Sequence, residues 1–71
     1  MRFAKSEFLE TLRIVENKIG TRLASQHQNL RIDVSNLDYA KAAIAQAKAE
    51  ALAEVLAVVQ EEIAYWESRI K

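Results

Sequence analysis

Apolar residues between Ser6 and Leu30 recur with the period of an α-helix. At about 100° per residue they occupy one sector less than a right angle wide, with Leu9 at its edge. Ser6 is placed to cap the first turn. Because the stripe keeps its phase across Gly20, the pattern predicts one helix over about residues 6–30. The stripe comprises Phe8, Leu12, Val15, Ile19, Leu23 and Leu30.

The period changes after this helix. Ile32 and Val34 alternate with Arg31 and Asp33, which is the two-residue period of a short strand or of extended backbone. A lone strand has no neighbour within the chain, so we expect an extended connector over about residues 31–36; the alternative is a strand that pairs with the same segment of another copy. Ser35 and Asp38 at its end have the spacing of a capping box, and Asn36 is an alternative cap. A second helix is therefore predicted to begin near residue 37.

The second predicted helix covers about residues 37–70 and has two apolar lines. No proline interrupts it. One line holds Leu37, Ile44, Ala51 and Val55, and a single neighbouring helix cannot cover both lines. We expect the first helix to cover this line and the other line to form an oligomer interface. That interface comprises Leu52, Leu56, Val59, Ile63, Trp66 and Ile70.

Together these segments predict an all-α fold, an antiparallel helical hairpin of two long helices forming one domain over residues 1–71. A chain of 71 residues has a marginal core of its own. The uncovered line therefore predicts a homo-oligomer, a dimer or higher even assembly, with two hairpins closing into a four-helix bundle. This architecture is similar to that of the small RNA-organising protein Rop, with which the sequence shares no motif.

The composition argues against catalysis. The chain has no cysteine, one glycine and one histidine, so it lacks a thiolate metal site and a glycine-rich phosphate loop. No carboxylate or hydroxyl is spaced with His27 to form a catalytic constellation. We expect no catalytic residue, no cofactor and no bound metal. The protein is not expected to be an enzyme.

Several polar residues interrupt the apolar sectors. Lys41 and Lys48 fall within the sector of the second helix, and with Arg22 and His27 they outline a polar, basic pocket near the connector that could hold an anion. Alternatively, the lysine stems lie along a helix seam with their ammonium groups in water. Lys5 and Glu62 are expected to face each other across the open end.

One apolar residue lies outside the predicted core. Ile14 falls nearly opposite the apolar stripe of the first helix, and Phe3 shares that side if the helix begins earlier. Together they would form a surface for a protein partner, whereas Ile14 alone is an ordinary exposed isoleucine.

Charge gives weak support to nucleic acid as a partner. Ten basic and ten acidic residues cancel over the chain, so no strong field attracts nucleic acid or an anionic membrane. Arg2, Arg13 and Arg31 share a line on an unbroken helix, but this footprint is sparse and lacks interleaved aromatic residues.

The sequence thus favours a structural or interaction protein, a self-associating hairpin that presents a surface to a protein partner as an adaptor, inhibitor or small regulatory subunit. The alternatives are a Rop-like RNA- or DNA-binding bundle and an anion site at a subunit seam. Residues 40–59 carry four charged side chains, which argues against a transmembrane helix. The first ten residues lack the apolar region of a signal peptide, so we expect a cytoplasmic location.

Overall fold

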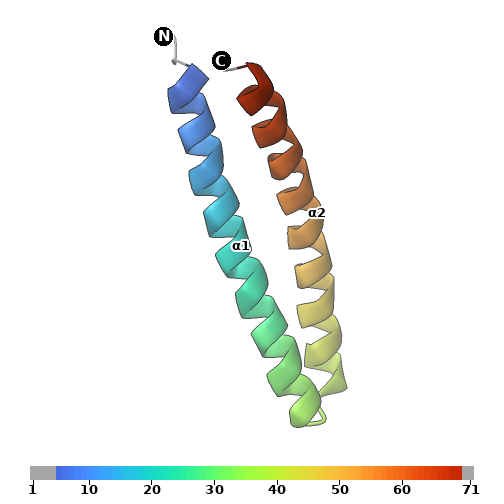
Figure 1. Ribbon diagram of the computed structural model, residues 1–71. Helices are drawn as coiled ribbons and strands as arrows, with labels where there is room; N and C mark the ends of the chain where they lie inside the picture. The colour runs from blue at the N-terminus through green and yellow to red at the C-terminus, as the bar shows by residue number, and fades with distance from the viewer. Residues whose placement is uncertain (1–4, 70–71) are drawn as a thin grey trace.

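The chain folds into two antiparallel α-helices (Figure 1). The computed structural model describes residues 5–69. Helix α1 spans Lys5–Ser35, helix α2 spans Tyr39–Arg69, and residues 36–38 join them. The molecule is a rod with extents of 51 × 19 × 16 Å, and the first and last described turns lie together at the end opposite the loop. The predicted all-α helical hairpin is confirmed.

The predicted extended connector over residues 31–36 is wrong, because α1 continues to Ser35. The apolar alternation around residue 32 has a different origin. Leu30 is half-buried between the helices, whereas Ile32 and Val34 flank the contact on its two sides and are 49% and 47% exposed. Neither proline nor glycine stops the helix in this segment. Helix α2 accordingly begins at Tyr39, two residues later than expected.

A Schellman motif ends α1. The N–H of Asp38 donates to the carbonyl of Asp33 at 2.8 Å, and the N–H of Leu37 donates to the carbonyl of Val34 at 3.0 Å. Leu37 adopts a left-handed backbone conformation with φ 59°, in the position where glycine is usual. Asp38 then caps α2, since its Oδ1 accepts a 3.2 Å hydrogen bond from the N–H of Lys41.

A seam of buried and half-buried residues runs along both helices. Its members recur alternately at three and four residues, which is the spacing of the core positions of a coiled coil. On α1 they are Leu9, Leu12, Glu16, Ile19, Leu23, Gln26, Leu30 and Asp33. Asp38 continues this spacing in the loop, and on α2 the members are Ala42, Ala45, Ala49, Leu52, Leu56, Val59, Ile63 and Trp66.

This seam reverses the predicted roles of the two apolar lines of α2. Ile63 is only 6% exposed in the single chain, so α1 covers the line that had been assigned to the oligomer interface. The line expected to face α1 is open instead, with Ile44 56% and Val55 50% exposed. The reason is register: the short turn fixes which side of α2 meets α1. In the described residues, the buried apolar core is limited to Ala42, Ala45, Ala49 and Ile63.

Candidate functional site

One long side of the hairpin exposes a set of large apolar side chains from both helices. Each member directly precedes a seam residue in the sequence, so the set follows the seam along the same side. We call this side the valine flank. Its apolar members are Phe8, Val15 and Ile32 on α1 and Ile44, Val55, Val58, Tyr65 and the smaller Ala51 on α2; among them Val55, Val58 and Ile44 are at least half exposed.

Val15 and Val55 lie at the same level on this flank. Arg22 and Lys48 line a common hollow between the helices. Val15 is seven residues before Arg22 on α1, and Val55 is seven residues after Lys48 on the antiparallel α2. Seven residues are about two turns, or roughly 10 Å along either helix. The two valines therefore form one apolar layer near the middle of the rod.

Aromatic residues occupy the open end of the hairpin. The rings of Phe8 and Trp66 meet edge to face with centroids 5.2 Å apart, and Tyr65 meets Trp66 in the same way at 5.4 Å. The guanidinium of Arg69 lies over the Tyr65 ring, 4.7 Å from its centroid. Tyr65 remains 47% exposed, so its ring extends the valine flank to this end of the molecule.

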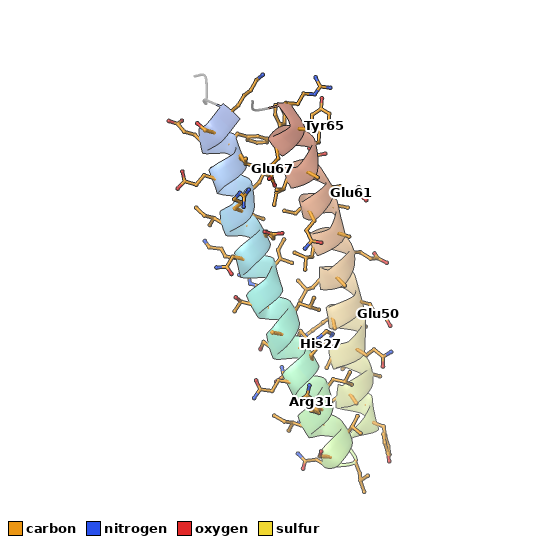
Figure 2. All side chains as sticks on the ribbon, viewed as in Figure 1. His27, Arg31, Glu50, Glu61, Tyr65 and Glu67 are labelled. Atoms are coloured by element: carbon orange, nitrogen blue, oxygen red, sulfur yellow. The ribbon has the colours of Figure 1, made fainter. Side chains whose placement is uncertain are left out.

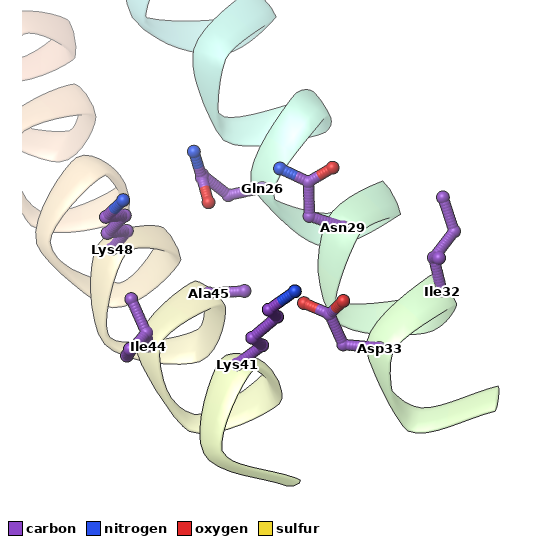
Figure 3. Close-up of a pocket in the computed structure, with 8 residues that line it drawn as sticks. All are labelled: Gln26, Asn29, Ile32, Asp33, Lys41, Ile44, Ala45 and Lys48. Atoms are coloured by element: carbon purple, nitrogen blue, oxygen red, sulfur yellow. The ribbon is translucent and has the colours of Figure 1, made fainter. Parts of the chain in front are cut away.

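A hollow lined by both polar and apolar side chains marks the loop end of the same flank (Figure 3). Lys41 and Lys48 from α2 line it together with Gln26, Asn29 and Asp33 from α1. Figure 3 shows the side chains of Lys41 and Asp33 pointing toward one another. Lys41 also pairs with Asp38 in its own helix, at 3.8 Å between Nζ and Oδ2. A carboxylate inside the hollow disfavours an anionic ligand there.

The structure divides the predicted basic pocket between two sides of the hairpin. Arg22, Lys41 and Lys48 belong to the valine flank. His27 lines a separate hollow with Leu30, Arg31 and Val34, and Figure 2 shows its place on the ribbon. The four residues are therefore not brought together around one ligand.

The predicted oligomer interface also divides. Leu52, Leu56, Val59 and Trp66 are half-buried and Ile63 is buried, all along the seam with α1. Ile70 lies outside the described residues.

Of the predicted partner surface, only Ile14 is described. It is 51% exposed, and Phe3 lies outside the described residues. The partner surface therefore stays a prediction that rests on one observed side chain.

The predicted ion pair between Lys5 and Glu62 is not formed, because the register differs from the one expected. At the open end, Arg13 of α1 instead reaches Glu67 of α2, with 3.3 Å between Nη2 and Oε2. This pair also engages one of the three arginines considered for nucleic-acid binding. Arg31 is exposed, and Arg2 lies outside the described residues.

Neither a metal-binding cluster nor a membrane-spanning helix is found in residues 5–69. No group of three or more histidine, cysteine, aspartate or glutamate side chains there is arranged to hold a metal ion. In the same part of the chain, neither helix has a stretch long and apolar enough to cross a membrane.

Comparison of the chain with protein-family models, curated proteins and solved structures finds no match. Functional interpretation therefore depends on the surface itself. Sequence reasoning missed Val58 and Tyr65 as surface residues, although both directly precede residues of the line that α1 covers. Once the seam residues are known, the position directly before a seam residue identifies Val58 and Tyr65 as members of the flank.

Proposed function

We propose that this protein is a non-enzymatic interaction protein, a helical hairpin that self-associates through its valine flank and presents its remaining surface to a protein partner. The observation that carries the proposal is the row of half-exposed side chains at Ile44, Val55, Val58 and Tyr65 on α2. Large apolar side chains gathered along one exposed face are typical of interaction sites in soluble proteins. Dimerisation, the protein partner and the cytoplasmic location remain predictions of the proposal.

The thin core supports association. Within residues 5–69, the buried hydrophobic residues are three alanines and one isoleucine, and none of them is fully buried. Alanine burial contributes little, because the stabilisation from burial scales with the apolar area removed from water. Small domains commonly compensate for such a core by oligomerising. A second hairpin on the valine flank would bury the side chains that α1 leaves exposed.

The other two interpretations receive less support. An anion site would include Lys41 and Lys48, but Asp33 lines the same hollow. A nucleic-acid surface would use Arg13, which is already engaged by Glu67. Removing an arginine from that line should leave self-association unchanged.

Sedimentation over a range of concentrations tests the proposal. We expect a dimer, or a higher even oligomer, at micromolar concentration, with a melting temperature that rises with concentration. Val55→Glu should give a folded monomer under the same conditions, because a carboxylate would be buried without a partner. A monomeric wild-type protein whose melting temperature does not depend on concentration would contradict the proposal.

Ile14→Glu is the matched control. Ile14 is as exposed as Val55 but lies on the outside of α1, away from the valine flank. This variant should associate like the wild-type protein. If Phe3 and Ile14 mark the partner surface, Ile14→Glu should also lose a co-purifying protein that Val55→Glu retains.

A further inference from the structure

We propose that the valine flank binds a second copy of this chain head to tail, about a two-fold axis that passes through the Val15 and Val55 layer. This inference rests on the proposed self-association and adds its geometry. In this arrangement α1 faces α1 of the second copy and α2 faces α2 of the second copy. Each hairpin places its loop end beside the open end of the other.

The charges on the flank are distributed about Val55 in the way this axis requires. Lys48 lies seven residues before Val55, and Glu62 lies seven residues after it. Rotation by 180° about the two-fold axis through the valine layer therefore brings Lys48 of each copy to the level of Glu62 of the other copy. The same rotation occurs for both copies, so the dimer contains this opposite-charge contact twice.

Helix α1 repeats the pattern about Val15. Phe8 lies seven residues before Val15, and Arg22 lies seven residues after it. The rotation brings the Arg22 guanidinium to the level of the Phe8 ring of the second copy, where a cation–π contact is favourable. Arg22 and Lys48 already line one hollow, so a single layer would set two cations against an aromatic ring and a carboxylate.

A two-fold axis parallel to the helices is less favourable. It would place α1 against α2 of the second copy with both loops at the same end. Lys48 of each copy would then face Arg22 of the other copy, which sets like charges together. Glu62 would face Phe8 and would gain no cation. The charge pattern therefore selects the head-to-tail arrangement.

On α2, apolar residues fill the layers between the charged ones, whereas on α1 the corresponding flank positions hold Thr11, Lys18 and Ser25. Val55 meets Val55 of the second copy at the axis, and Ala51 falls level with Val58. Further out, Ile44 falls level with Tyr65, and both are about half exposed in the single chain. Small residues opposite larger ones allow the helices to approach closely.

One contact at the ends of this dimer is unfavourable in charge. Lys41 falls near the level of Arg69 of the second copy. Each has a partner in its own chain: Lys41 pairs with Asp38 at 3.8 Å, and Arg69 lies over the Tyr65 ring at 4.7 Å. Both side chains sit at the rim of the interface, where solvent screens their repulsion.

The flank is large enough for a stable interface. The rod measures 51 Å along its axis and at least 16 Å across. A standard interface buries roughly 800 Å² on each partner. A face of this length and width supplies that area if most of it is covered.

A charge-swap series measured by sedimentation tests the orientation. Lys48→Glu should weaken the dimer about tenfold or more, because the lost attraction and the new repulsion with Glu62 each occur twice. Glu62→Lys should act in the same way. The double variant Lys48→Glu/Glu62→Lys restores opposite charges between copies and should return the dissociation constant to within a few-fold of the wild-type value.

Single cysteines provide an independent measurement, since the natural chain has none. Val55→Cys should form an intermolecular disulfide readily under mild oxidation, because residues at a two-fold axis lie within reach of each other. Ala53→Cys is the control: Ala53 is exposed on the same helix but lies on the other side of the seam. It should cross-link slowly.

The outcomes separate the two proposals. If the wild-type protein is a dimer but the double variant fails to recover and Val55→Cys does not cross-link, the head-to-tail geometry is wrong while self-association stands. If Lys48→Glu alone abolishes a dimer that the double variant restores, the geometry is supported. A monomeric wild-type protein overturns both proposals, and far-UV circular dichroism of each variant shows that the helices remain folded.

Discussion

The backbone N–H of Asp38 donates to the carbonyl of Asp33 at 2.8 Å, and this hydrogen bond closes the turn between the helices. Between the two residues, Leu37 has φ 59° and a side chain that is 70% exposed. Its side chain therefore returns little packing energy for a backbone conformation that costs non-glycine residues roughly 1–2 kcal/mol. The backbone hydrogen bonds of the turn therefore hold Leu37 in a strained conformation.

Replacing Leu37 with glycine should raise the free energy of unfolding by about 0.5–1 kcal/mol. Glycine removes the strain, and the greater freedom of the unfolded chain offsets part of that gain. Urea denaturation at one fixed protein concentration measures the change. Leu37→Ala, which keeps a Cβ atom, should show no comparable gain; a glycine variant less stable than wild type would contradict the assignment of strain.

Asp38 caps α2 through the N–H of Lys41. Asp38→Ala should lower the free energy of unfolding by about 1 kcal/mol, because it removes the acceptor for a free helix N–H group. Asp38→Asn keeps an acceptor of similar shape and should lose much less. Thermal denaturation measures both variants. Equal losses of stability would mean that the charge of Asp38, rather than its capping hydrogen bond, is responsible.

The buried alanines test how closely the helices approach. Ala49 is 5% exposed on the seam, so Ala49→Leu should overpack it and cost typically 1–3 kcal/mol. Ala47 is exposed on the same helix, and leucine is nearly as good a helix former as alanine. Ala47→Leu should therefore be close to neutral. Similar denaturation midpoints for the two variants would place Ala49 outside a tight contact.

Gly20 lies within α1, where a Cβ atom would meet no other atom within 4 Å. Gly20→Ala should therefore raise the free energy of unfolding by about 0.5–1 kcal/mol through helix propensity alone. Circular dichroism during urea titration measures it. A destabilised variant would indicate a close approach at Gly20 that the single hairpin does not contain.

Local patterns were sufficient to predict the two helices and their antiparallel order. The continuous apolar stripe through Ile19 and Leu23 and the absence of proline gave both elements. The turn was misplaced because alternation at Ile32 and Val34 is typical of extended backbone, while Leu37 gives no sign that it adopts a left-handed conformation. A glycine at that position would have revealed the C-cap.

The choice between the two apolar lines of α2 could not be made from the sequence. Ile44 and Ile63 are equally apolar, and either line satisfies the helical period. Only the register set by the short turn decides that Ile63 is buried and Ile44 is exposed. An error of a few residues in the turn therefore exchanges core and surface over the whole length of the helix.

The edge-to-face contact of Phe8 with Trp66 has a practical consequence for observing this hairpin. Trp66 is the only tryptophan in the sequence. It lies at the open end of the hairpin, where the contacting residues of the two helices are farthest apart in sequence. Bringing together residues so distant along the chain carries the largest loop-closure entropy in the hairpin, so this end should open first. Tryptophan emission and far-UV circular dichroism should consequently give denaturation curves that do not coincide. The separation between those curves measures fraying of the free end, reported by a fluorophore that the chain already carries.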